Sequence, residues 1–203
     1  MTGHFVRRAS DQVWVPDDYG LARRWPAILF LHGAGERGDD NEKQTTVGLG
    51  LHLRDGTLDP PAVVIFPQCP AESRWTGETR RAMAALDDAC EEYSIDPHRV
   101  SLTGISQGGA GVWALAMAYP DRWSAIAPVC GWVVGARRRV TMPAWIFHGS
   151  DDTVVRVEES RAMAELLGGA AIYTEFPGVK HNSWDPAYTT TGVVDWLVKQ
   201  KRP

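Results

Sequence analysis

A short glycine-flanked segment places a serine where it can act as a nucleophile. Residues 104–108 read Gly-Ile-Ser-Gln-Gly and join an apolar, strand-like segment to a helix-forming one. At such a strand-to-helix turn the glycines let neighbouring backbone pass close by, and the serine hydroxyl is left exposed. The helix N-terminus points at the same place, so the Gln107 N–H favours negative charge on a bound carbonyl oxygen. We predict Ser106 as a nucleophile; the alternative is a glycine-rich turn with an idle serine.

A second glycine-rich segment can supply another backbone donor. Residues 32–38 read His-Gly-Ala-Gly-Glu-Arg-Gly and follow an apolar run that ends at Leu31. In a hydrolase arrangement the second oxyanion donor comes from the loop after an early strand. We expect the Ala34 N–H to fill this role beside Gln107, with Gly35 as the alternative donor.

A serine hydroxyl is a weak nucleophile until a base takes its proton, so an imidazole and an orienting carboxylate are expected on later strand ends. Asp152 follows the apolar run 144–147, and His181 follows the alternating run 171–176. We predict a triad of Ser106, Asp152 and His181. Asp151 is the alternative acid, and only one of the two neighbours can orient the imidazole. His32 and His148 each precede a glycine at a strand end and are interpreted as structural hydrogen-bonding groups.

Short apolar runs alternate with helical patterns along the whole chain, which is typical of an α/β protein. The sequence predicts at least five buried parallel strands, an alternating edge strand at 171–176 and one more strand at 12–15 on the opposite edge. Right-handed crossovers favour a doubly wound, mostly parallel sheet with helices on both faces. The predicted strands cover residues 27–31, 62–66, 99–103, 124–129 and 144–147, and the predicted helices cover 78–93, 106–119, 157–167 and 185–199.

Composition limits the classes of protein to which the chain can belong. With 203 residues, 44% of them hydrophobic and 23% charged, we expect residues 1–203 to form a single globular domain. The net charge of −4 and the scattered basic residues give no positively charged surface for nucleic acid. No apolar run has the length of a membrane span or the form of a secretory signal, so we expect no membrane partner and a cytoplasmic protein. The three cysteines lack metal-ligand spacing, and we expect them to be reduced, with no metal and no cofactor.

Several motifs together resemble one enzyme family. These are Leu-His-Gly-Ala-Gly-Glu-Arg-Gly-Asp-Asp-Asn at 31–41, Pro-Gln-Cys-Pro at 67–70, Glu-Tyr-Ser-Ile-Asp-Pro-His-Arg at 92–99, and the segment around Ser106. The chain resembles the small phospholipase/carboxylesterase branch of the α/β-hydrolases, which is akin to acyl-protein thioesterases, feruloyl and depolymerase-type esterases and predicted peptidases. The family pattern H-G-x-x-D-x-x-V, laid on residues 148–155, implies Asp152 as the acid, and the resemblance also implies Ala34 and Gln107 as oxyanion donors.

Two departures from this family pattern bear on the fold. Only 25 residues precede Pro26, so we expect the early antiparallel strands to be reduced or partly missing. The segment 131–141, where many relatives insert a cap of helices, is short. We therefore expect no cap domain and an open, shallow site.

The substrate is expected to be a small ester. Trp75, Trp132 and Trp184 fall near the predicted site and are candidates to wall an acyl pocket, and packing of loops is the alternative for each. Glu36 and Arg37 either bind a polar group of the substrate or form an internal ion pair that shapes the loop. We expect a serine carboxylesterase that acts on short-chain acyl esters. Thioesterase, feruloyl esterase, acetyl-xylan esterase and peptidase activities are alternatives that use the same triad. The non-enzymatic alternative is a ligand-binding protein on a hydrolase scaffold.

Overall fold

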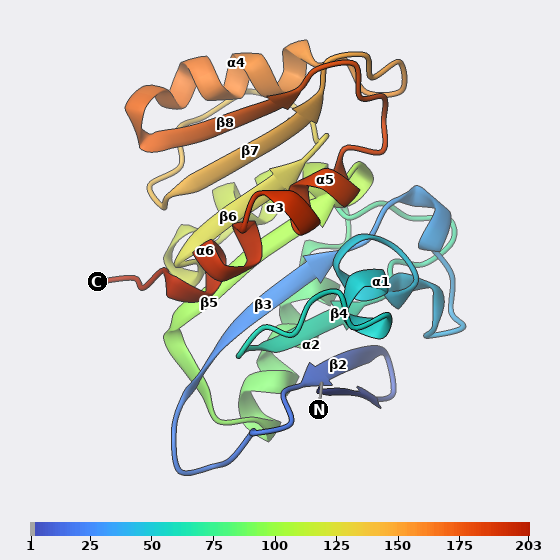
Figure 1. Cartoon of the computed structure of the whole chain (residues 1–203), viewed down its shortest axis with the longest axis vertical. Coiled ribbons are helices and arrows are strands. Elements are labelled where there is room, and N and C mark those ends of the chain that lie inside the picture. The colour runs from blue at the N-terminus through green and yellow to red at the C-terminus, as the bar shows by residue number, and fades with distance from the viewer. Residues whose placement is uncertain (1–2) are drawn as a thin grey trace.

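Eight strands form one mixed sheet in the order β1-β2-β4-β3-β5-β6-β7-β8 (Figure 1). The structure is a computed structural model that describes residues 3–203. β1 pairs antiparallel with β2, β2 pairs antiparallel with β4, and every later neighbour is parallel. The strands are β1 His4–Arg7, β2 Asp11–Val15, β3 Trp25–Leu31, β4 Val63–Pro67, β5 Ile95–Ile105, β6 Ala125–Val129, β7 Ala144–Gly149 and β8 Ala171–Phe176.

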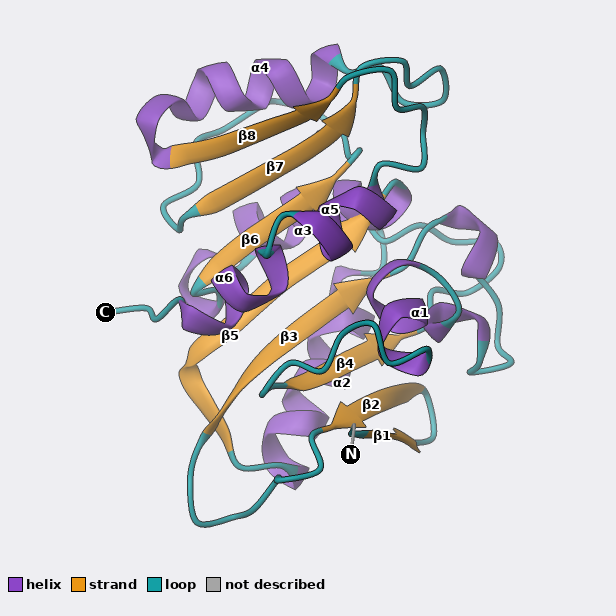
Figure 2. Cartoon of the chain, in the orientation of Figure 1, coloured by secondary structure: helices purple, strands orange, loops and turns teal. Residues whose placement is uncertain are grey.

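Helices cover both faces of this sheet, as Figure 2 shows. One buried cluster joins the sheet to α2, α3 and α4, and a second joins its other face to α1, α5 and α6. Alternate side chains of β3 enter opposite clusters, Leu29 the first and Phe30 the second, as the two-residue period of a strand requires. The helices are α1 Gly48–Arg54, α2 Thr79–Glu92, α3 Gln107–Ala118, α4 Glu158–Leu167, α5 Trp184–Thr190 and α6 Val193–Lys199.

The predicted fold class is confirmed, and the strand predicted at 12–15 is present as β2, although its predicted place at the edge was wrong. The early antiparallel strands are short rather than missing. β1 and β2 are both present, although they have only four and five residues, and β1 rather than β2 lies at the edge. β1 escapes notice in the sequence because its side chains are exposed or only half-buried and show no clear apolar alternation. β8 lies at the opposite edge, as predicted.

The predicted C-terminal helix is two helices, α5 and α6. Gly192 separates them with φ of 73°, a left-handed conformation that side-chain-bearing residues seldom adopt, so the first helix cannot continue through it. The first of the two begins at Trp184, after Ser183, and not at the Asp185-Pro186 pair. α1 was not predicted.

Residues 3–203 place no helical cap over the carboxyl edge of the sheet. Residues 131–143, between β6 and β7, contain no helix or strand. Cys69 and Cys130 are buried, Cys90 is exposed, and all three are free thiols. None of the helices among residues 3–203 has the length and apolar character needed to cross a bilayer.

Candidate active site

Ser106 stands at the turn between β5 and α3, in a strained backbone conformation. Its φ and ψ are 52° and −115°, a combination that few residues other than glycine adopt. The Ser106 N–H donates to the Val129 carbonyl at 2.9 Å, which holds the turn against β6. A Cβ atom on Gly104 would lie 2.8 Å from the Leu31 carbonyl oxygen, and one on Gly108 would overlap the same oxygen. The glycines are therefore required because β3 passes directly against the turn.

The three side chains predicted as a triad meet at the carboxyl edge of the sheet. The Ser106 hydroxyl lies 2.9 Å from His181 Nε2, and His181 Nδ1 lies 2.7 Å from Asp152 Oδ2. Since a carboxylate only accepts, Nδ1 carries the proton and Nε2 is free to accept from the serine. Asp151 is exposed and accepts instead from the Ser150 hydroxyl at 2.7 Å. A hydroxyl, an imidazole and a carboxylate linked in this order can activate serine as a nucleophile.

The Asp152 carboxylate is held by four donors in a buried position. Oδ1 accepts the backbone N–H groups of Val154 and Val155 at 2.8 and 2.9 Å. Oδ2 faces His181 and also the His148 Nε2 atom at 3.2 Å. Burial raises the pKa of Asp152, but the hydrogen bonds from His181, Val155 and Val154 outweigh it, so the pKa lies below its ordinary value. The carboxylate therefore stays ionised beside the imidazole.

His148 supports Asp152 from the side away from His181. The His148 side chain is fully buried, and Nε2 lies 3.0 Å from the Val155 carbonyl, so this nitrogen carries a proton that it shares between the carbonyl and Asp152. Nδ1 accepts from the Ser160 hydroxyl at 2.7 Å. Burial lowers the pKa of His148, which keeps the ring neutral. The sequence interpretation of His148 as a structural group did not foresee that it contacts the predicted acid itself.

Two backbone amides beside Ser106 have no protein acceptor. Within residues 3–203, neither the Ala34 N–H nor the Gln107 N–H donates a hydrogen bond, and each opens a helix, Ala34 a 3₁₀ turn over Ala34–Glu36 and Gln107 the helix α3. Free amides at helix N-termini attract negative charge. These are the two donors that the sequence predicts for an oxyanion.

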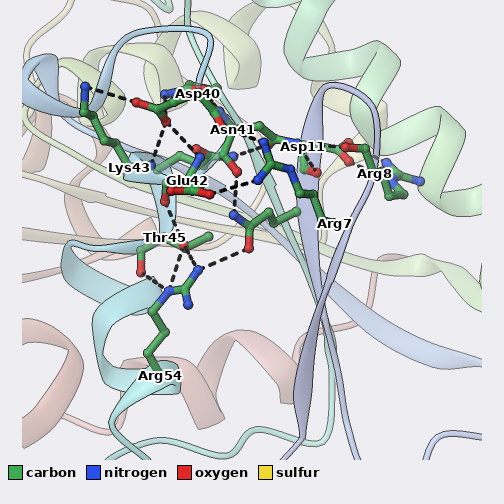
Figure 3. Close-up of polar contacts among 12 residues, drawn as sticks. Arg7, Arg8, Asp11, Asp40, Asn41, Glu42, Lys43, Thr45 and Arg54 are labelled. Carbon is green, nitrogen blue, oxygen red and sulfur yellow. Dashed lines mark hydrogen bonds and ion pairs between the residues drawn. The ribbon is translucent and has the colours of Figure 1, made fainter.

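A polar network anchors Asn41, at the end of the loop that carries Ala34, and Figure 3 draws the contacts around this residue. The Asn41 N–H donates to Gln68 Oε1 at 2.7 Å, and the Asn41 side-chain amide donates to the backbone carbonyls of Arg8 and Asp11 at 2.8 and 3.1 Å. Gln68 in turn donates to the Glu36 carbonyl at 3.0 Å. These hydrogen bonds tie the motif at 31–41 to the β1–β2 hairpin and to Gln68, which directly follows β4.

His32, at the start of this loop, is a structural group. Its side chain is fully buried, Nδ1 donates to the Gly33 carbonyl at 2.6 Å, and Nε2 accepts from the Cys69 N–H at 3.0 Å. Burial lowers the pKa of His32 to about 4, so the ring is neutral near pH 7. The position of His32 agrees with its interpretation as a hydrogen-bonding group.

A cavity of about 280 Å³ opens at Ser106, and only one of the three predicted tryptophans lines it. Trp184 contributes to its wall and contacts His181 edge-on, with ring centroids 5.4 Å apart. Trp75 is fully buried in the core, where its indole donates to the His32 carbonyl at 3.0 Å, so its prediction as a pocket wall is wrong. Trp132 is half-buried and is not among the lining residues. The remaining wall is formed by residues 33–36, Val47, Ile105, Val154 and His181.

Sequence reasoning also missed Cys130. Its thiol, the Asp152 carboxylate and a His181 ring nitrogen lie within 4.8 Å of one another. Burial raises the pKa of Cys130 to about 12, so the thiol is neutral near pH 7. Cys130 directly follows the predicted strand 124–129, and Asp152 and His181 also lie shortly after predicted strands. This position after a strand is the sequence feature that could have placed Cys130 near the site.

Comparison with known proteins identifies relatives of this fold and sequence. The fold superposes on a crystal structure of a thermostable esterase with a TM-score of 0.85 and 31% sequence identity, covering 98% of this chain and 62% of that one. Carboxylesterase SOBER1 of Arabidopsis thaliana is 25% identical over 188 residues, which span 76% of this chain and 82% of that protein. The chain is related to the α/β-hydrolase esterases.

Another relative is much larger than this chain. A bifunctional acetylxylan esterase/xylanase of Neocallimastix patriciarum is 29% identical over 154 residues, which span 72% of this chain but 22% of that protein. This chain therefore spans about a fifth of that relative and less than two thirds of the thermostable esterase. No profile of a known protein family matches the sequence.

Proposed function

We propose that the protein is a serine carboxylesterase that hydrolyses short-chain acyl esters through an acyl-enzyme intermediate. The observation that carries the proposal is the continuous hydrogen-bond chain from Ser106 through His181 to Asp152, with distances of 2.9 and 2.7 Å, at the mouth of a cavity. Similarity to esterases in sequence and fold supports the same chemistry.

In the proposed reaction His181 Nε2 takes the hydroxyl proton as Ser106 attacks the ester carbonyl. The Ala34 and Gln107 amides stabilise the negative oxygen of the tetrahedral intermediate, and His181 then protonates the departing alcohol. Asp152 keeps the proton on Nδ1 and stabilises the imidazolium that forms. Water then repeats the sequence on the acyl-enzyme and releases the acid.

The size of the site favours a short acyl group. A cavity of about 280 Å³ is at the lower end of small-molecule sites, and residues 131–143 place no cap over it. Each methylene group that is buried contributes about 0.8 kcal/mol to binding. The methylene groups of a long acyl chain would extend into water beyond the cavity and would not contribute.

Replacement of the serine tests the proposal directly. The Ser106→Ala variant should hydrolyse 4-nitrophenyl acetate with kcat lowered by about 10⁴-fold or more, because the nucleophile is absent. Ser10→Ala, which removes an exposed serine on the β1–β2 turn, is the matched control and should retain wild-type turnover. Near-normal turnover by a folded Ser106→Ala variant would end the serine mechanism.

A further inference from the structure

Glu36 brings a carboxylate to the wall of the cavity at Ser106. It ends the 3₁₀ turn that begins with Ala34, and its side chain is 19% exposed. The side chain folds back over Gly33, so that a Cβ atom there would lie 3.1 Å from Glu36 Oε2. The carboxylate is therefore held beside the predicted oxyanion site and away from bulk solvent.

In the described part of the chain, residues 3–203, no cation neutralises this carboxylate. The adjacent Arg37 is used elsewhere, because its Nε donates to the Ala34 carbonyl at 2.9 Å and its Nη1 to the Ser73 carbonyl at 3.3 Å. The internal ion pair between Glu36 and Arg37, one of the two expectations from the sequence, is therefore not formed. Among residues 3–203, no lysine or arginine pairs with Glu36 and no side chain donates to it within hydrogen-bond distance.

The nearest imidazole does not supply the missing charge either. His32 Nδ1 lies 4.0 Å from Glu36 Oε2, but its proton is directed to the Gly33 carbonyl and the ring is neutral near pH 7. Burial raises the pKa of Glu36, and the backbone N–H groups of Gly33 and Glu36 offset this only in part. A half-buried carboxylate with unused acceptor sites costs free energy until a donor pairs with it.

We propose that Glu36 is a specificity-determining residue that accepts a hydrogen bond from a hydroxyl group of the substrate, so that the preferred esters carry a hydroxyl in their acyl or alcohol part. This inference rests on the proposed esterase function. A hydroxyl suits the site better than an ammonium group, because it needs only the one acceptor that Glu36 offers. The lining side chains of Val47, Ile105 and Val154 carry no acceptor, and Trp184 offers only its aromatic face, so an ammonium group would lose most of its hydrogen bonds to water.

Matched pairs of esters test this inference with pH-stat assays on the full chain. One pair is ethyl acetate and 2-hydroxyethyl acetate, and the other is ethyl butyrate and ethyl 3-hydroxybutyrate. The quantity measured is the ratio of kcat/KM for the hydroxylated ester to that for its partner. In at least one pair, Glu36→Ala should lower this ratio by about tenfold, as expected for loss of a hydrogen bond to a charged acceptor. Glu36→Gln keeps an acceptor oxygen and should lower it by roughly threefold.

Glu72→Ala is the matched control, because it removes one exposed acidic residue and should leave both ratios unchanged. If Glu36 only shapes the loop, its variants will slow both members of each pair alike and the ratios will not move, which would overturn the inference. Acetylcholine serves as a cationic probe; a larger loss for it than for 2-hydroxyethyl acetate in Glu36→Gln would overturn the hydroxyl assignment. Failure of the wild-type protein to hydrolyse any of these esters or 4-nitrophenyl acetate would overturn the proposed function itself.

Discussion

The Asp152→Asn substitution changes one atom of the proposed site and should have a large, predictable effect. Oδ1 accepts the Val154 and Val155 amides at 2.8 and 2.9 Å, so the oxygen of the new amide must remain there. Its NH2 group then faces His181 Nδ1, where the carboxylate accepted a proton at 2.7 Å. Because two donors cannot pair, the imidazole proton moves to Nε2, and this nitrogen no longer accepts from Ser106.

The magnitude follows from the loss of the base. The corresponding change in a characterised Ser-His-Asp triad lowers kcat by about 10⁴-fold, or about 5.4 kcal/mol of transition-state stabilisation. The new NH2 group also opposes the His148 Nε2–H, whose nitrogen lies 3.2 Å from Oδ2 in the native protein. An unsatisfied buried donor costs about 1–3 kcal/mol, so the free energy of unfolding should fall as well.

The assay is steady-state hydrolysis of 4-nitrophenyl acetate near pH 7, with urea unfolding to confirm that the variant is folded. Asp151→Asn is the matched control, since Asp151 is exposed and its side chain accepts a hydrogen bond from the Ser150 hydroxyl, not from His181. Its turnover should stay within about twofold of the wild type, as is usual for a surface substitution. Turnover by Asp152→Asn within tenfold of the wild type, or a greater loss in Asp151→Asn, would refute the assignment of the acid.

Two further predictions concern stability. Gly108→Ala should lower the free energy of unfolding by about 3 kcal/mol or more in urea titrations, because the new Cβ overlaps the Leu31 carbonyl. Gly169→Ala is the control, since a Cβ there would have no atom within 4 Å, and it should change the free energy of unfolding by less than about 1 kcal/mol. Equal effects of the two substitutions would contradict the close approach of β3. His32 has a folded-state pKa of about 4 against an ordinary value of 6.5, so the unfolded chain binds a proton that the folded protein resists. Its contribution to stability is therefore present above pH 6.5 and should decrease by about 3 kcal/mol as the pH falls to 4. In His32→Gln the fall in the free energy of unfolding between pH 6.5 and pH 4 should be smaller by about 3 kcal/mol than in the wild type. An identical pH dependence of stability in the wild type and the variant would contradict this prediction.

The meeting of Ser106, Asp152 and His181 could be predicted because each follows a strand. Parallel strands end at one edge of a sheet, so residues far apart in the chain converge there without any knowledge of side-chain packing. The strands themselves were recognisable since β3, β4 and β6 are buried on both faces and read as continuous apolar runs. The geometry of the site thus depends on features that a single sequence displays.

Other features depend on packing that no local pattern reveals. Trp75 and Trp184 are both tryptophans that lie close in the sequence to segments of the predicted site. Trp75 is nevertheless buried against His32, whereas Trp184 lines the cavity. Arg37 is adjacent to Glu36 in the chain, but it contacts the Ala34 and Ser73 carbonyls instead. In each case the outcome is decided by where distant loops meet, which sequence spacing does not specify.

Covalent labelling of the serine tests the central claim most directly. The protein is incubated with diisopropyl fluorophosphate, esterase activity is followed, and the modified residue is located by peptide mass spectrometry. The proposed mechanism predicts one phosphoryl adduct per chain on Ser106, loss of activity in proportion to labelling, and no adduct in His181→Ala. Full labelling of another residue, or activity that persists while Ser106 is fully modified, would contradict it.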